Sequence, residues 1–229
     1  MASFPTRERL GEADLFLKII LLGDAGTGKT SLMLKYTQSD LDDSDRYQNS
    51  LDTSSKIIHR DDKTIQLDIR DTAGMERYRS LTKSHYNGAS GALVLFELTD
   101  AKSFSNVAHW LEDLKQYTDH PDRVQVILVG TRCHKKDQRT VPGDRITKLA
   151  EHHGANVIEI SVEENINVTE TFDQLVDRIL SARPEFRGEG QPLFLPIPSD
   201  EHKELDFSCS QCCPIGARHR DSGSGDGGG

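Results

Sequence analysis

The stretch FLKIILLGDAGTGKTSL, residues 16–32, contains an apolar run, a glycine-rich turn and the start of a second apolar pattern. The run from Leu15 to Leu22 is nearly continuous, as expected of a strand that a parallel sheet buries on both faces. The next segment, GDAGTGKT at residues 23–30, fits the pattern G-x-x-x-x-G-K-[ST]. Because it lies between a strand and a helix, the pattern predicts a phosphate-binding loop rather than a glycine-rich turn with an exposed lysine.

The residue types in this loop suit the phosphate chain of a nucleotide. Gly26 and Gly28 allow backbone N–H groups to turn toward an anion, and the helix N-terminus adds partial positive charge. Lys29 can reach the β- and γ-phosphates, and the hydroxyl of Thr30 can ligate Mg²⁺. The residues predicted to contact phosphate are Asp24, Ala25, Gly26, Thr27, Gly28, Lys29, Thr30 and Ser31.

A second segment, DIRDTAGMERY at residues 68–78, supplies further groups. Asp71 ends a predicted strand, where its carboxylate can hold Mg²⁺ through water. Gly74 leaves its backbone N–H free to approach a γ-phosphate. An isolated D-x-x-G is weak, but downstream of a phosphate loop it predicts Thr30 and Asp71 as Mg²⁺ ligands and Gly74 as a phosphate contact.

Strands and helices alternate over residues 15–182. Buried strands are expected at residues 92–98, 124–129 and 157–160, and a hairpin is expected at 54–59 and 64–69. Apolar spacing predicts helices around residues 32–36, 104–114, 146–150 and 172–179, the last with Asn167 and Glu170 as a capping box. This alternation predicts an α/β fold, with a doubly wound, mostly parallel sheet that binds ligands at the carboxyl ends of its strands.

Composition limits the partners. The 229 residues carry a formal net charge of −9, which gives a nucleic-acid partner no electrostatic support. No apolar run approaches the roughly 18 residues that span a bilayer, and the first residues contain no secretory apolar region. Three of the four cysteines lie near the C-terminus, which is no disulfide framework and indicates a reducing, cytoplasmic location. We expect an N-terminal tail at 1–14, a P-loop domain at 15–182 and a flexible, cysteine-containing tail at 183–229.

Three segments carry a resemblance to a known family: FLKIILLGDAGTGKTSL, DTAGMERYRSLTKSHYNGASGALVLFELTD and KSFSNVAHWLEDL. Over residues 15–181 the chain resembles a Ras-superfamily small GTPase, and within that superfamily the Rab family. The resemblance implies a six-stranded sheet flanked by five helices, and binding of GTP or GDP with Mg²⁺. It also implies action in vesicle traffic on the cytosolic face of endomembranes, with effector and regulatory proteins contacting residues 45–56 and 71–90.

The catalytic positions depart from the family. Where the family usually has a Gln that orients the attacking water, this chain has Met75, whose thioether cannot offer both a donor and an acceptor. Gln48 stands where the family has the Thr that ligates Mg²⁺. With neither catalytic position intact, we expect GTP hydrolysis no faster than the roughly 10⁻⁴ s⁻¹ of unassisted small GTPases.

The positions by which Rab proteins meet their effectors also differ. The family segment I-G-x-D-F reads NSLDT here, and the exposed aromatic triad is replaced by Thr53, Arg70 and His85. Because aromatic anchors dominate many interfaces, either the partners differ from those of other Rab proteins or this surface is not used. The alternative is that neighbouring side chains such as Tyr78 and Tyr86 suffice.

The base-reading motif departs furthest. Small GTPases read guanine with N-K-x-D, and the corresponding residues here are Thr131, Arg132, Cys133 and His134. Thr131 can keep a hydrogen bond, and Arg132 can stack on the base. His134 cannot replace the Asp, because a neutral imidazole offers one acceptor and a protonated one offers none. Losing two charge-assisted hydrogen bonds is expected to weaken guanine binding by very roughly 10²–10⁴-fold and to blunt discrimination against adenine.

A second family segment, S-A-K, supports the base and reads Ser161, Val162 and Glu163 here. The backbone N–H of Val162 remains available for the guanine oxygen. Asp137 is an alternative source of the missing carboxylate. The predicted base contacts are therefore Thr131, Arg132, His134, Ser161 and Val162.

The C-terminal tail contains a candidate lipid site. Rab proteins typically end in paired cysteines that receive geranylgeranyl groups, and Cys212 and Cys213 form such a pair, followed by PIGARHRDSGSGDGGG. The segment PLFLPIP, residues 192–198, resembles the element by which the prenylation escort grips Rab proteins, or is a stray apolar patch. Prenylation, S-acylation and no lipid all stay open, and we expect membrane contact only through a lipid anchor. A metal site built from Cys209, Cys212, Cys213 and His219 would lack a core to organise its ligands.

The sequence leaves two functions open. One is a divergent Rab-like guanine-nucleotide-binding protein with weak GTP hydrolysis in membrane traffic. The other is a pseudo-GTPase, a scaffold that holds nucleotide with relaxed base specificity and does not switch. An empty site is disfavoured, because nothing structural requires Lys29 beneath a glycine-rich turn.

Overall fold

The computed structural model describes residues 13–38, 53–60, 62–72, 83–183 and 186. All of these belong to one unit, Met1–Pro198. The strands are β1 (Leu15–Gly23), β2 (Thr53–Arg60), β3 (Lys63–Asp71), β4 (Gly91–Glu97), β5 (Gln125–Thr131) and β6 (Asn156–Glu159). The helices are α1 (Lys29–Gln38), α2 (Lys83–Tyr86), α3 (Ala101–Tyr117), α4 (Gly143–His153) and α5 (Val168–Ala182), with short 3₁₀ helices η2 (Pro121–Arg123) and η3 (Lys136–Gln138).

The strands form one six-stranded sheet in the order β2-β3-β1-β4-β5-β6. Only β2 and β3 pair in antiparallel fashion, and the other neighbours are parallel. Asp62 lies in the turn between β2 and β3 with φ +61°, a left-handed conformation that Asp tolerates better than most residues. The predicted α/β fold and the predicted hairpin are confirmed.

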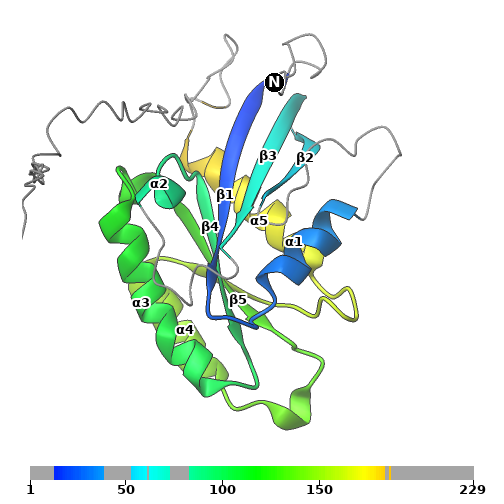
Figure 1. The fold of residues 1–229 in the computed structure, drawn as a ribbon, viewed down its shortest axis with the longest axis vertical. Helices are drawn as coiled ribbons and strands as arrows, with labels where there is room; N and C mark the ends of the chain where they lie inside the picture. Colours follow the sequence, from blue (N-terminus) through cyan, green and yellow to red (C-terminus); the bar gives the residue numbers. More distant parts are fainter. Residues whose placement is uncertain (1–12, 39–52, 61, 73–82, 184–185, 187–229) are drawn as a thin grey trace, which may run out of the picture. The chain divides into compact units, whose positions relative to one another are not determined.

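The continuous apolar run of β1 is explained by burial on both faces. Leu17, Ile19 and Leu21 pack into a core cluster that includes side chains of α1 and α5. Ile20 and Leu22 pack into a second cluster that includes side chains of α3 and α4. Figure 1 shows α3 and α4 lying together on one side of the sheet. β1 therefore lies at the centre of a three-layer domain, with its carboxyl end free to lead into the glycine-rich loop.

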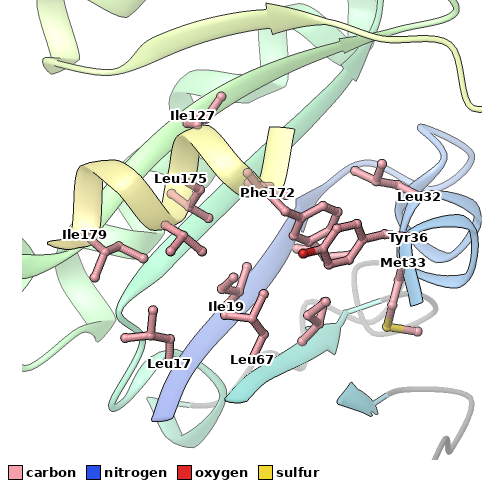
Figure 2. Packing of buried hydrophobic residues seen from close by; sticks show 14 of the residues in the cluster. Leu17, Ile19, Leu32, Met33, Tyr36, Leu67, Ile127, Phe172, Leu175 and Ile179 are labelled. Atoms are coloured by element: carbon pink, nitrogen blue, oxygen red, sulfur yellow. The ribbon is translucent and has the colours of Figure 1, made fainter. Parts of the chain in front are cut away.

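An aromatic pair joins the helices on one face of the sheet. The ring of Tyr36 from α1 stacks on the ring of Phe172 from α5, with centroids 3.8 Å apart and planes 12° from parallel (Figure 2). Both side chains are fully buried. Lys56 of β2 places its ammonium 4.1 Å above the Tyr36 ring and donates to the Tyr36 carbonyl at 2.9 Å. These contacts fix the helix that follows the glycine-rich loop against the core.

The predicted capping box at the start of α5 is wrong. Asn167 precedes the helix in a left-handed conformation, with φ +55°, and its side chain makes no capping hydrogen bond. Instead its Nδ2 donates to the carbonyl of Glu159 at 2.8 Å, which ties the start of α5 to the end of β6. A capping Asn normally has an extended backbone, so the left-handed conformation of Asn167, held by this tertiary contact, takes the place of the local cap. Within the described part of the chain, no helix is long and apolar enough to cross a membrane.

Candidate nucleotide-binding site

The glycine-rich loop connects the end of β1 to the first turn of α1. Gly23 has φ +136°, and a Cβ there would lie 2.3 Å from the Leu95 carbonyl oxygen, so only glycine fits. The buried Lys29 donates from Nζ to the carbonyls of Gly23 at 2.8 Å and Asp24 at 2.9 Å. The ammonium thus lies against the loop itself, next to the N-terminus of α1. This is the arrangement that the phosphate-loop prediction requires.

The side chain of Asp24 is held by helix α3. Its Oδ2 accepts from Asn106 Nδ2 at 2.6 Å, and its Oδ1 accepts from Trp110 Nε1 at 2.9 Å. We call these three residues the Asp24 clamp. Both carboxylate oxygens of this predicted phosphate-binding residue are therefore engaged, so its contribution to an anion site would come from the backbone. Asn106 and Trp110 were not predicted; their four-residue spacing on one helix face was the available signal.

The two predicted Mg²⁺ ligands meet at the carboxyl ends of adjacent strands. Asp71 ends β3 directly beside Leu21 of β1, and it is buried. The hydroxyl of Thr30 donates to Asp71 Oδ2. Thr72 Oγ1 donates to the Leu21 carbonyl at 2.7 Å, which fixes the chain just after Asp71. A hydroxyl and a carboxylate next to a phosphate loop are hard oxygen donors, so this pair fits Mg²⁺.

The predicted base-reading loop lies next to the phosphate loop. A Cβ built on Gly28 would lie 4.0 Å from Cγ2 of Thr131, at the end of β5. Thr131 is buried, and its Oγ1 donates to the Phe96 carbonyl at 3.2 Å. Cys133 N–H donates to the Ile160 carbonyl at 3.0 Å, which joins this loop to the segment after β6. The phosphate loop and both predicted base-contacting segments thus form one continuous region at the carboxyl edge of the sheet.

His134 is held from both sides by the segment after β6. Its Nδ1 lies 2.8 Å from Ser161 Oγ, and its Nε2 lies 2.8 Å from Glu163 Oε2. Ser161 Oγ also accepts from the Glu164 backbone N–H at 3.1 Å. The assignment that satisfies every group has Ser161 donating to Nδ1 and Nε2–H donating to Glu163. The one acceptor that a neutral His134 could offer to a base is therefore already used.

Arg132 is also engaged within the protein. It adopts φ +61°, and its guanidinium pairs with the carboxylate of Glu97 at 2.8 Å. Burial, followed by the charges of Glu159 and Glu164, raises the pKa of the neighbouring Cys133 thiol. This thiol is therefore protonated near neutral pH and is a poor nucleophile. Neither Glu97 nor Glu163 was predicted as a site residue, although Glu163 stands in the third position of the S-A-K segment.

The predicted effector positions are only partly described. Thr53 and Arg70 are register partners on β2 and β3, and the Arg70 Nε lies 3.1 Å from an Asp68 oxygen. Tyr86 is fully buried, with its ring centroid 5.6 Å from that of Tyr117. The suggestion that Tyr86 replaces an exposed aromatic anchor is therefore wrong, because its ring packs inward from α2.

Several predicted site residues lie outside the described residues. These are Gln48, Gly74, Met75, Tyr78, Cys212 and Cys213, together with most of residues 45–56, much of 71–90, and all of 192–198. The predictions for hydrolysis, for most of the effector surface and for the lipid site therefore stay predictions.

Comparison with known proteins extends the picture beyond the site. A family model described as the Ras family matches residues 18–181. Ras-related protein Rab-3A of Homo sapiens is 37% identical over 179 residues, which cover 78% of this chain and 80% of that protein. Ras-related protein Rab-3D of Mus musculus is 36% identical over 206 residues, covering 86% and 91%. Ras-related protein RAB1BV of Beta vulgaris is 34% identical over 216 residues, covering 93% and 99%.

Proposed function

The chain belongs to the Ras family as a Rab-like small GTPase, and we propose that it binds Mg²⁺ with GTP or GDP, hydrolyses GTP slowly and acts in vesicle traffic. The observation that supports nucleotide binding most directly is the arrangement of Lys29, Thr30 and Asp71 around one glycine-rich loop. Three groups with different chemistry converge there, and each suits a different part of a Mg²⁺–nucleotide complex.

Each of these groups has a separate role in the proposal. The loop backbone presents N–H groups to phosphate oxygens, and the Lys29 ammonium contacts the β- and γ-phosphates. The Thr30 hydroxyl and the Asp71 carboxylate would hold Mg²⁺, which when bound offsets the negative charge of the phosphates. The Asp24 clamp fixes the loop to α3, so the N–H groups keep their direction before the nucleotide arrives.

Nucleotide content tests this part of the proposal. Freshly purified protein is expected to carry guanine nucleotide at near-unit occupancy, measured by chromatography of the denatured supernatant. Lys29→Ala is expected to abolish binding, because it removes the cation at the phosphate site. Lys35→Ala, on the exposed side of the same helix, is the matched control and should keep its nucleotide. Equal nucleotide content in the two variants would show that the phosphate-loop assignment is wrong.

We propose that hydrolysis is slow because Met75 cannot orient water. Single-turnover measurement on GTP-loaded protein should give a rate no higher than roughly 10⁻⁴ s⁻¹. Met75→Gln should raise that rate, while Met75→Leu, which also lacks a polar group, should not. A wild-type rate clearly above this scale would contradict the role given to Met75.

A second candidate function is a nucleotide-binding scaffold that does not discriminate bases. The observation in its favour is that both ring nitrogens of His134 already have partners, so this residue does not read guanine. Titration with GTP, GDP and ATP separates the two functions. A strong preference for guanine supports the Rab-like switch, and similar affinities for GTP and ATP support the scaffold.

We propose that effectors and regulators contact residues 45–56 and 71–90, and that the protein works on the cytosolic face of endomembranes. Its membrane attachment would be a lipid on Cys212 and Cys213, with residues 192–198 contacting the prenylation escort. Family membership and the paired cysteines support this. Mass spectrometry of protein made in eukaryotic cells is the test, and an unmodified pair at full stoichiometry would exclude the anchor.

A further inference from the structure

The unusual feature of the base-reading region is a carboxylate on the loop after β6, whereas the family's base-reading Asp lies on the loop after β5. Glu163, which follows β6, lies against His134, which follows β5. We propose that Glu163 is the residue that reads the guanine edge and that His134 positions it. This inference rests on the proposed function, because it concerns which base the site selects.

A chain of hydrogen bonds holds Glu163 against His134. Ser161 is fully buried, and its hydroxyl oxygen lies 2.8 Å from His134 Nδ1. His134 Nε2 in turn donates to Glu163 Oε2 at 2.8 Å. The imidazole therefore lies between a fixed hydroxyl and the carboxylate. An arrangement of this kind orients the carboxylate beside the residue that stands at the family's Asp position.

The remaining acceptors of Glu163 match what guanine offers. Guanine presents two donors on one edge, N1–H and the 2-amino group. A carboxylate has two oxygens with about four acceptor sites, so Oε2 can accept from His134 and from one guanine donor. Among the described residues, Oε1 of Glu163 makes no hydrogen bond, and the side chain is 60% exposed. Both guanine donors can therefore be paired without breaking the contact to His134.

The other carboxylates of this region are less suitable. Glu97 pairs with Arg132 at 2.8 Å, and Glu159 pairs with Arg139 at 2.6 Å. Asp137 lies in η3, where it is exposed and makes no hydrogen bond to His134. Glu163 is the described carboxylate that is both bound to His134 and left with a free oxygen. Glu163 stands where the family's S-A-K segment has a basic Lys, and His134 stands where the N-K-x-D motif has an acidic Asp. The acidic side chain is therefore on the loop after β6 and the basic one on the loop after β5.

The test is base selectivity in the purified full-length protein. Binding of Mg²⁺ with GDP, XDP or ADP is measured by isothermal titration for the wild type and for Glu163→Gln. The carboxamide keeps one acceptor but places an amino group against the guanine 2-amino group. The same amino group can donate to the carbonyl that xanthine carries at that position. Glu163→Gln is therefore expected to lower GDP affinity by roughly 10- to 100-fold and to raise XDP affinity by about tenfold.

Two control variants distinguish a direct contact between Glu163 and the base from a role of Glu163 in holding the loop in place. Glu164→Gln changes the adjacent exposed carboxylate and keeps the backbone N–H that binds Ser161, so it should leave all three affinities unchanged. Adding His134→Asp to Glu163→Gln restores a carboxylate on the β5 loop and should recover the preference for GDP over XDP. Thermal unfolding without nucleotide checks that each variant is folded.

The outcomes distinguish this inference from the proposed function. A reversal of the GDP-to-XDP ratio in Glu163→Gln, corrected by His134→Asp, supports Glu163 as the reader. If the wild type binds GDP but Glu163→Gln leaves the ratio unchanged, or weakens all nucleotides alike, the inference is wrong and the proposed function stands. A wild type that binds GDP and ADP equally also overturns the inference. A wild type that binds no nucleotide overturns the proposed function, and the inference with it.

Discussion

The Asp24 clamp should contribute measurably to stability and to nucleotide affinity. Its carboxylate accepts from Asn106 Nδ2 at 2.6 Å and from Trp110 Nε1 at 2.9 Å, and both donors come from α3. The change to make is Trp110→Phe, which removes the indole N–H and keeps most of the apolar ring. The loop that carries Asp24 should then be less well fixed in the direction needed for phosphate.

The magnitude follows from the type of bond. A hydrogen bond to a charged group contributes about 1.5–3 kcal/mol. The two donors and Asp24 are only half-buried, so water can partly replace the lost donor, and the lower end, about 1.5 kcal/mol, applies. For a domain of this size that corresponds to a fall in Tm of roughly 3–6 °C. GDP affinity should fall as well, because part of the free energy of binding would be used to order the loop.

A double-mutant cycle gives the decisive assay. Thermal and urea unfolding are measured for Trp110→Phe, for Asp24→Ala and for the double variant. If the indole acts through Asp24, Trp110→Phe should destabilise the wild type but have almost no effect in the Asp24→Ala background. His109→Gln, an exposed change one residue away on α3, is the control and should be neutral. An equal loss of stability in both backgrounds would refute the clamp, because the ring would then act only by packing.

Three further predictions concern the fold. Phe172→Ala should lower the unfolding free energy by about 3–5 kcal/mol, measured in urea. Removing this fully buried ring leaves a cavity and deprives Tyr36 of its stacking partner. Gly23→Ala should prevent folding to the native state, because its Cβ would meet a β4 carbonyl oxygen at 2.3 Å. The control is Gly154→Ala, where φ is +63° but the space around the added Cβ is open. It should lower the unfolding free energy by only about 1 kcal/mol in the same denaturation assay. Burial, followed by the charge of Lys115, lowers the pKa of His153, so the folded protein binds fewer protons there than the unfolded chain does. Stability should therefore fall as the pH drops through the ordinary histidine pKa of 6.5, and His153→Gln should flatten that part of the stability profile; an unchanged slope would contradict the assignment.

The fold was predictable because its signals are local and repeated. The alternation of apolar strands with amphipathic helices appears in the sequence, and the hairpin shows as two short strands around a polar turn. The capping box failed for the opposite reason. Asn167 has a local pattern that fits a cap, but its amide reaches the Glu159 carbonyl in β6, and no local pattern indicates that contact.

The sequence by itself determined the residues of the predicted phosphate half of the site. Residues 23–30 are consecutive, so the backbone conformation of one loop brings their groups together, and Thr30 joins Asp71 because β1 and β3 are neighbours in the sheet. Only the tertiary structure decided the base half. His134 and Ser161 are 27 positions apart, and they meet because β5 and β6 pair in a register that aligns Gly130 with Glu159. A hydrogen bond between two loops depends on that register and on side-chain reach. The position of the Glu163 carboxylate beside His134 is therefore a property of the folded chain.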